Sequence, residues 1–274
     1  ALIREGQYNK AIKKLNKVIE KNPKFFGGYL YLGDAYYEMR DYHSSIEMYK
    51  KTVELKPNCV DAYTSLGISC FSGECFNESL EAFRMAKEIE PHSATAYHNM
   101  GAVYYAMGKF QDSLRAYTKA AHLRPRDTDT RNGLISACVA LGEPEKAITL
   151  WEKITHDSPN FSFYLVLGIK ATKKGQLSEA DKYLKRSLKL NSSYPLIYGA
   201  LGRLYFKQGR LKEGLDIYQK CKAKNGDYAV EIFKACREVV HSNKEIATML
   251  REQIDDLEGE LKELAQKFLT DRKQ

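Results

Sequence analysis

Apolar residues recur along this chain with the spacing of helices and, at a longer interval, with the spacing of a repeat. Within single stretches they lie three or four positions apart, as at Phe110, Leu114 and Tyr117, which predicts amphipathic helices. A five-residue pattern that begins with tyrosine and ends with glycine returns after 34 residues, and its phase continues further along the chain. It occupies residues 29–33, 63–67, 97–101, 164–168 and 198–202. The sequence is therefore a tandem array of one supersecondary unit.

Each unit is interrupted near its middle by glycine and closed by proline. The interrupting residues are Gly6, Gly73 (with Glu74), Gly108, Gly142, Gly175 and Gly209. The closing residues are Pro23, Pro57, Pro91, Pro125 and Pro159. Because a second apolar-periodic stretch follows each glycine, the pattern predicts two antiparallel helices joined by a short turn.

Small residues recur at matching phases of the two helices. The pairs are Gly33 with Ser45, Gly67 with Ser79, Gly101 with Ser113, Gly168 with Ala180 and Gly202 with Gly214. Glycine inside a helix costs about 1 kcal/mol relative to alanine, so its recurrence predicts a close approach of the two backbones. One large apolar residue follows on each second helix: Tyr49, Phe83, Tyr117, Trp151, Leu184 and Tyr218. A single unit cannot bury these faces, which predicts a stacked solenoid.

These residues closely resemble the tetratricopeptide repeat family. The resemblance covers Ala1 to about Gly226, as one partial repeat and six full repeats. The full repeats begin near Phe26, Val60, Ala94, Thr128, Phe161 and Pro195. It implies an all-α fold, a right-handed α-solenoid of helix-turn-helix repeats (residues 1–226) followed by a C-terminal segment with a long helix (227–274). The incomplete first repeat suggests a longer parent protein.

The fourth repeat departs from the family pattern. Arg131 stands at the aromatic position, Ile135 stands where glycine belongs, and the repeat is one residue short. We therefore expect a local change of curvature near Asn132 to Gly142.

The family resemblance implies that the first helices line a concave groove, where extended peptides or partner helices bind. The inward positions include Tyr31, Asp34, Tyr37, Glu38, Ser65, Ile68, Phe71, His98, Asn99, Ala102 and Tyr105. The candidate partner-binding residues are Tyr31, Tyr37, Phe71, His98, Asn99, Tyr105, Lys173, Arg203, Phe206 and Lys207. Four of them, Tyr37, Phe71, Tyr105 and Phe206, share one phase and form an aromatic stripe. This stripe either packs locally or anchors a bound peptide.

Two groove chemistries known in the family are missing from the sequence. The positions of the basic and amide clamp for a C-terminal carboxylate read Leu30, Asp34, Ser65, Thr95 and Asn99. An asparagine ladder would need Asn at one recurrent position, where Asn99 stands without counterparts in the other repeats. Neither chemistry is predicted.

The net charge of +8 over 274 residues is concentrated in one segment. Residues 170–224 contain fourteen Lys and Arg and four Asp and Glu, which leaves the rest of the chain at −2. Such a field attracts acidic partners. We expect a protein partner with an acidic or extended segment; the alternative is a targeting module that attaches through this segment to an anionic polymer or surface, such as RNA, DNA, microtubule tails or membrane lipid. The segment contains no module of the kind that nucleic-acid readers build from basic residues and aromatic or recognition elements, which argues against nucleic acid.

The C-terminal segment has a different pattern. Residues 228–240 can form a helix that covers the last repeat, and Ser242 with Glu245 resembles a capping box that opens another helix. Apolar residues then alternate three and four apart, as in a coiled coil. They include Leu250, Ile254, Leu257, Leu261, Leu264 and Phe268. These residues predict either a helix folded back onto the solenoid, or self-association or pairing with a partner's helix.

The sequence offers no catalytic constellation, so we predict a non-catalytic scaffold or adaptor without cofactor or metal. The six histidines are scattered, and the six cysteines form no pair with zinc spacing. We expect free thiols in a reducing compartment, with the cytoplasm as the default. The sequence contains no run of 18 apolar residues, so it predicts no membrane span.

Overall fold

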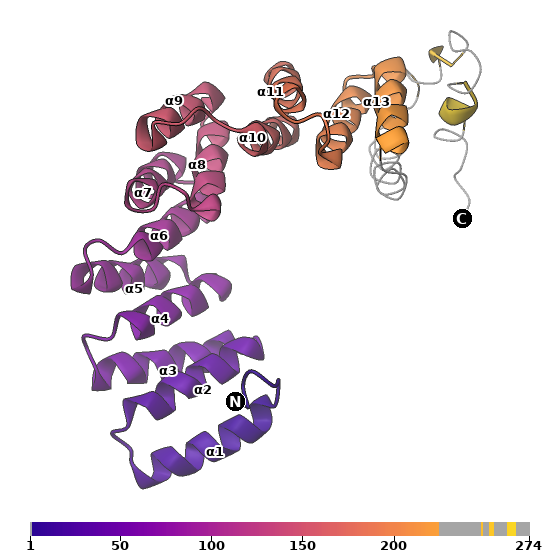
Figure 1. The fold of residues 1–274 in the computed structure, drawn as a ribbon. Helices are drawn as coiled ribbons and strands as arrows, with labels where there is room; N and C mark the ends of the chain where they lie inside the picture. The colour runs from indigo at the N-terminus through magenta and orange to yellow at the C-terminus, as the bar shows by residue number, and fades with distance from the viewer. Residues whose placement is uncertain (1, 225–247, 249–251, 255–261, 267–274) are drawn as a thin grey trace. The chain divides into compact units, whose positions relative to one another are not determined.

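The computed structural model describes residues 2–224, 248, 252–254 and 262–266. The named helices of this part of the chain are thirteen, and no strand occurs among its residues. The chain divides into two compact units, residues 1–137 (unit 1) and 138–274 (unit 2). Figure 1 shows the helices of each unit following one another as a series of antiparallel pairs.

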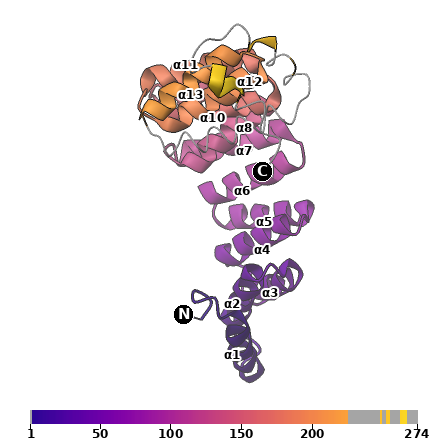
Figure 2. The same cartoon turned by 90° about the vertical axis from the view of Figure 1, so that its right-hand side faces the viewer.

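Unit 1 contains the first seven helices and most of the eighth. They are α1 (Tyr8–Lys21), α2 (Phe26–Glu38), α3 (Tyr42–Leu55), α4 (Val60–Ser72), α5 (Phe76–Ile89), α6 (Ala94–Ala106), α7 (Phe110–Leu123) and α8 (Thr128–Ala140). Contacts join α2 to α3, α4 to α5 and α6 to α7, and each pair contacts the next. Figure 2 shows α1 to α7 stacked in chain order.

Unit 2 holds the end of α8 and five further helices. They are α9 (Pro144–Thr155), α10 (Phe161–Lys174), α11 (Leu177–Leu190), α12 (Pro195–Lys207) and α13 (Leu211–Lys224). The boundary between the units lies within the fourth repeat, the one that departs from the repeat pattern. The expected change of curvature there stays a prediction, as does a division of the chain after residue 226.

The predicted repeat starts are confirmed. The first helix of each full repeat begins at the residue read from the sequence: Phe26, Val60, Ala94, Thr128, Phe161 and Pro195. The chain is therefore an all-α solenoid of helix-turn-helix repeats.

The turns within the repeats need one residue in the left-handed backbone region. Gly108, Gly142, Gly175 and Gly209 supply it with φ of 70° to 80°. In the first two full repeats the position is held by Arg40 and Glu74, each with φ of 61°. Gly73 has a φ of −88°, so the glycine marked this turn in the sequence without occupying its left-handed position.

In unit 1, the glycine of each first helix makes room for an aromatic ring of the second helix. The pairs are Gly33 with Tyr49, Gly67 with Phe83 and Gly101 with Tyr117. A Cβ on Gly67 would lie 2.6 Å from the Phe83 ring, which is 1% exposed. The sequence predicted a close approach of backbones here, but ring atoms are the nearest neighbours. The glycine therefore leaves the space that the aromatic ring of the second helix occupies; we call this space the ring seat.

The phase-matched serines of unit 1 tie the two helices of each repeat together. Ser79 Oγ donates to the Gly67 carbonyl at 2.7 Å. Equivalent bonds run from Ser45 to Gly33 at 2.9 Å and from Ser113 to Gly101 at 2.8 Å. All three serines are fully buried, so each hydroxyl has its partner inside the repeat.

Unit 2 has the same glycine phase with different neighbours. Gly168 faces Leu184, and a Cβ there would lie 2.6 Å from the leucine side chain and 3.3 Å from its backbone nitrogen. The close backbone approach that the sequence predicted is present at this glycine. Its carbonyl accepts the hydroxyl of Thr172, from the same helix, at 2.8 Å.

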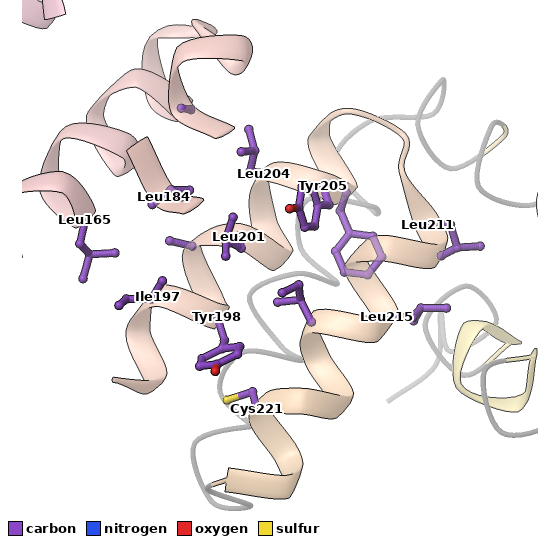
Figure 3. Close-up of a cluster of buried hydrophobic side chains, with 14 of the residues drawn as sticks. Leu165, Leu184, Ile197, Tyr198, Leu201, Leu204, Tyr205, Leu211, Leu215 and Cys221 are labelled. Atoms are coloured by element: carbon purple, nitrogen blue, oxygen red, sulfur yellow. The ribbon is translucent and has the colours of Figure 1, made fainter. Parts of the chain in front are cut away.

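The largest core cluster of unit 2 spans α10 to α13. Figure 3 shows Leu201 and Leu204 of α12 pointing into it, with Leu211 and Leu215 from α13. All four are fully buried. Residues of the C-terminal segment complete this cluster: Ala265 is fully buried in it, and Ile254 and Leu264 pack against it.

Gln253 fastens this C-terminal segment to the turn between α12 and α13. Its Nε2 donates to the Gly209 carbonyl at 2.8 Å, and its Oε1 accepts from the Leu211 N–H at 3.2 Å. Gln253 lies in a turn and Ile254 in a bend. The long C-terminal helix expected from the sequence is not confirmed.

Candidate interaction grooves

A cavity of about 670 Å³ lies between α2 and α4 of unit 1. It is lined by Ile3, Arg4, Tyr31, Asp34, Tyr37, Glu38, Tyr49, Ser65 and Ile68. Six of these, Tyr31, Asp34, Tyr37, Glu38, Ser65 and Ile68, are positions that the repeat phase placed on the inner surface. The structure brings them together around one hollow.

Asp34 and Tyr49 form a hydrogen-bonded pair in the wall of this cavity. The Tyr49 hydroxyl donates to Asp34 Oδ1 at 2.6 Å. Burial raises the pKa of Asp34, and the hydrogen bond from Tyr49 opposes this shift. Burial and the neighbouring carboxylate raise the pKa of Tyr49 far above its ordinary value, so this phenol keeps its proton and acts as donor. The corresponding first-helix positions of the next two repeats are Ile68 and Ala102.

The rim of the cavity is aromatic and acidic. Tyr31 is 52% exposed, and Tyr37 is half-buried with its hydroxyl 3.3 Å from Ser72 Oγ. Glu38 is exposed and has no ion-pair partner among the residues that the structure describes. The rim therefore offers aromatic faces beside a carboxylate that a ligand can reach.

Sequence reasoning missed Tyr49, Ile3 and Arg4 as lining residues. Tyr49 belongs to a second helix and was assigned to the core, where it is indeed buried to 3% exposure. The available signal was the combination of this hydroxyl with an acidic residue at Asp34, since the next two repeats have Ile68 and Ala102 at that position. Ile3 and Arg4 precede the first helix, where the repeat pattern gives no phase.

The aromatic stripe packs locally in unit 1. Each of its rings contacts the aromatic residue that opens the following helix. The centroid distances are 5.6 Å for Tyr37 and Tyr42, 5.8 Å for Phe71 and Phe76, and 5.3 Å for Tyr105 and Phe110. These contacts favour the local-packing interpretation, although each stripe residue of unit 1 stays half-buried and open on one side.

His98 and Asn99 lie half-buried on α6. His98 Nδ1 is 2.9 Å from the Thr130 hydroxyl of α8, and its ring meets the Tyr117 ring edge-on at 5.4 Å. His98 therefore links neighbouring repeats as well as lying at an inward position.

Three cations predicted for the groove are exposed on first helices of unit 2. Lys173 lies on α10, and Arg203 and Lys207 lie on α12, which contacts α10. Within the described part of the chain none of the three has an ion-pair partner. Their charges are available to a ligand.

Phe206 differs from its prediction as a partner-binding residue. It is fully buried, and its ring is the nearest neighbour of Gly214 on α13. The absent side chain of Gly214 admits the ring into the core of the repeat. Phe206 is therefore a core residue, and the aromatic stripe does not extend to it.

Three other basic residues of the segment 170–224, Lys182, Lys185 and Arg210, form ion pairs within unit 2. Asp181 pairs with Lys185 and, at 3.6 Å, with Arg210. Lys182 lies 3.8 Å from Glu145, which also accepts the Tyr183 hydroxyl at 2.6 Å. Lys182, Lys185 and Arg210 are thus partly neutralised, whereas Lys173, Arg203 and Lys207 form no ion pair with any described residue.

The residues predicted for self-association divide into two groups. Ile254 and Leu264 pack against the core cluster of unit 2. The others, Leu250, Leu257, Leu261 and Phe268, lie outside the described residues. Self-association through this segment stays a prediction.

The described cysteines are free thiols: Cys59, Cys70, Cys75, Cys138 and Cys221. Cys236 lies outside the described residues. Burial raises the pKa of Cys70 to about 11 and that of Cys138 to about 12, so neither thiol ionises near neutral pH. Across the described ranges, no cluster of three His, Cys, Asp or Glu side chains is placed to hold a metal ion. No helix in them is long and apolar enough to cross a membrane.

Family comparisons agree with this architecture. Models described as TPR repeat or tetratricopeptide repeat match residues 1–40, 32–94, 94–127 and 165–229. Together they cover more than half of the sequence, and the chain belongs to the tetratricopeptide repeat family. A model described as PPR repeat matches residues 129–157, within the departing fourth repeat and the turn after it. No curated protein matches the chain.

Solved structures share the fold at low identity. The crystal structure of MamA is 24% identical with a TM-score of 0.52, over 64% of this chain and 95% of MamA. A tetratricopeptide repeat protein from Parabacteroides merdae is 12% identical with a TM-score of 0.55, over 86% of this chain and 94% of that protein. A chain of the APC/C hetero-tetramer Cut9–Hcn1 is 15% identical with a TM-score of 0.53, over 86% of this chain and 47% of that one. At these identities the likeness concerns the fold.

Proposed function

We propose that this chain is a non-catalytic scaffold or adaptor of the cytoplasm. It binds an extended peptide or a partner helix along the inner positions of its first helices and so organises a multiprotein complex. The observation that carries this proposal is the cavity of unit 1, whose lining includes six residues that the repeat phase had assigned to a groove. A concave site with aromatic walls and a few polar groups is the usual form of a binding site.

Two further features support a binding role. Tyr31 presents a large, rigid side chain that is 52% exposed, the kind of residue that dominates interfaces. The Cut9–Hcn1 structure, which shares the fold, is that of a hetero-tetramer. Both features fit a surface whose task is contact with another chain.

Crosslinking mass spectrometry after pull-down from a native extract tests this proposal. We expect Tyr31→Ala to lose the partners that crosslink near α2 and α4, because truncation removes the exposed anchor. Tyr194→Ala is the matched control, since Tyr194 is 38% exposed and is not among the residues that line the cavity. If both variants recover the same partners in equal amounts, the cavity is not part of the binding surface.

A second candidate function rests on the unpaired cations of unit 2. Lys173, Arg203 and Lys207 would hold an acidic segment of a protein partner, or attach the chain to an anionic polymer or surface. The variant Lys173→Glu/Arg203→Glu/Lys207→Glu should lose such partners. Attachment to a polymer should also weaken steeply as salt is raised. If every partner still binds after this charge reversal, Lys173, Arg203 and Lys207 do not form a binding surface.

A further inference from the structure

The cavity of unit 1 carries charge opposite to that of the groove cations in unit 2. Its lining holds the carboxylates of Asp34 and Glu38 and one basic residue, Arg4, which is exposed. No ion pair joins Arg4 to either carboxylate, and within the described ranges neither carboxylate has a cationic partner. The cavity lining therefore holds two carboxylates and one basic side chain, and neither carboxylate is paired with that side chain.

The carboxylate of Asp34 is held in one orientation. One carboxylate oxygen accepts the Tyr49 hydroxyl at 2.6 Å, which fixes the orientation of the group. Tyr49 is the partner of Asp34 among the residues described, and a neutral hydroxyl supplies no positive charge. A cation that enters the cavity would stabilise the ionised form of this half-buried carboxylate, because burial has removed part of its hydration.

The aromatic residues of the rim suit the same ligand. Tyr31 and Tyr37 line the cavity on the helix that carries Asp34 and Glu38. A cation over a tyrosine face is attracted by the ring quadrupole. A long aliphatic stem can pack on the ring while its charged end reaches the carboxylate. Lysine and arginine side chains combine these two properties.

We propose that the cavity between α2 and α4 accepts a lysine or arginine side chain of an extended partner peptide. This inference rests on the proposed function of the groove and names the chemistry of its ligand in unit 1. Asp34 and Glu38 contact the charged end, and Tyr31 and Tyr37 contact the stem. An anionic side chain is repelled, since Asp34 and Glu38 both place a carboxylate in the cavity lining.

A random library of twelve-residue peptides displayed on phage supplies the probe. We expect peptides selected on the full chain to be enriched in lysine or arginine at one position. In synthetic copies, norleucine at that position should lower the affinity by about tenfold or more, the usual effect of losing a hydrogen bond to a charged group. Fluorescence anisotropy of labelled peptides measures this loss.

The double variant Asp34→Asn/Glu38→Gln should lower the affinity of these peptides to a similar extent. Asparagine keeps an acceptor for the Tyr49 hydroxyl, so the melting temperature should change little. The control Glu47→Gln/Glu81→Gln removes the same charge from exposed positions on second helices, where Glu47 and Glu81 are 59% and 67% exposed. It should leave the affinity within twofold.

The outcomes separate this proposal from the proposed function. Peptides that require Tyr31 but carry no basic residue, or that are unaffected by Asp34→Asn/Glu38→Gln, would overturn the cation site and leave the groove function standing. Selected peptides that bind equally well to Tyr31→Ala would overturn both. A selection that yields no peptide would likewise count against both.

Discussion

In unit 1 the second repeat seats the Phe83 ring on Gly67 and bonds Ser79 to the Gly67 carbonyl, from one helix to the other. In unit 2 the fifth repeat seats Leu184 on Gly168, and the carbonyl there is satisfied by Thr172 from the same helix. Both repeats keep the same phase of glycine. The difference shows that the repeat pattern specifies where the helices touch, while the contact itself has more than one chemical solution.

The two units also differ in the charge of their inner positions. Asp34 and Glu38 make the cavity of unit 1 acidic, whereas Lys173, Arg203 and Lys207 stand exposed on the first helices of unit 2. One fold thus offers different chemistry at equivalent positions, since inward residues of a solenoid are free of the packing that fixes the glycine phase.

Emptying the ring seat should have the largest effect on stability. Phe83→Ala should lower the free energy of unfolding by about 3–5 kcal/mol, because it leaves a cavity beside Gly67. Phe83→Leu, which copies the side chain used in unit 2, should cost about 1 kcal/mol. Urea denaturation followed by circular dichroism measures both. Leu190→Ala is the control, since Leu190 is 47% exposed; a loss no greater than that of the control would mean that the ring does not hold the repeat.

Filling the glycine seats should distinguish the two units. Gly67→Ala and Gly168→Ala should each cost about 1–3 kcal/mol through overpacking. The cost should be larger at Gly168, where a backbone nitrogen lies 3.3 Å from the added Cβ and cannot rotate away as a ring can. Gly73→Ala, whose nearest contact is at 3.4 Å, should be tolerated. Thermal unfolding ranks the three variants, and the reverse order of the first two would refute the backbone explanation.

Exchanging the hydroxyl groups should have a smaller effect. Ser79→Ala should cost about 1 kcal/mol, since it removes a buried hydrogen bond. Ala180→Ser, which places serine at the same phase of unit 2, should bring no gain because Thr172 already occupies the Gly168 carbonyl. In a Thr172→Val background the same serine should become stabilising. A double-mutant cycle in urea tests this, and additive effects would contradict it.

The helix caps should produce the smallest difference, visible as a pH dependence. Asp127 Oδ2 accepts from the Thr130 N–H at 2.9 Å, and hydrogen bonds from Thr130, through its side chain first, lower the pKa of Asp127. A lowered pKa in the folded state stabilises above the unfolded value of about 3.9 and is lost as the pH falls through the folded value. Asn160, which caps α10 through the Phe163 N–H at 3.0 Å, does not titrate.

Asp127→Asn should therefore reduce the loss of unfolding free energy between about pH 5 and pH 3 by about a few tenths of a kcal/mol for this partly exposed group, seen as a smaller drop in melting temperature. Asn160→Ala should lower the melting temperature equally at both pH values. Identical pH profiles for wild type and Asp127→Asn would show that this cap does not contribute to acid sensitivity.

Much of this architecture follows from the sequence, because several repeats indicate the same helix positions independently. The start of the helix at Phe26 is fixed by five other repeats that begin in the same way, and Tyr31 follows as an inward residue by counting. Counting fails where the two helices of one repeat pack differently from those of the other repeats. The phase of Phe206 predicts an open position, but Gly214 on the next helix admits its ring into the core.

Contacts made outside the repeat phase could not be predicted. The bond of Tyr49 to Asp34 depends on one hydroxyl, and the bonds of Gln253 to Gly209 and Leu211 join residues more than forty positions apart. The left-handed conformations of Arg40 and Glu74 also escaped, since side chains other than glycine rarely adopt them. Such features belong to individual repeats, and they distinguish this chain within its family.

Tyr117 has a consequence for the motions of unit 1. Its ring, 6% exposed, lies against Gly101 of α6 and Gly133 of α8, and a Cβ at either glycine would collide with it. A half-turn of this ring sweeps through space that both backbones occupy in a close-packed interior. The ring can flip only when α6 and α8 draw away from α7 together. The exchange rate of its NMR signals therefore measures how often α7 separates transiently from α6 within the third repeat and from α8 of the fourth repeat.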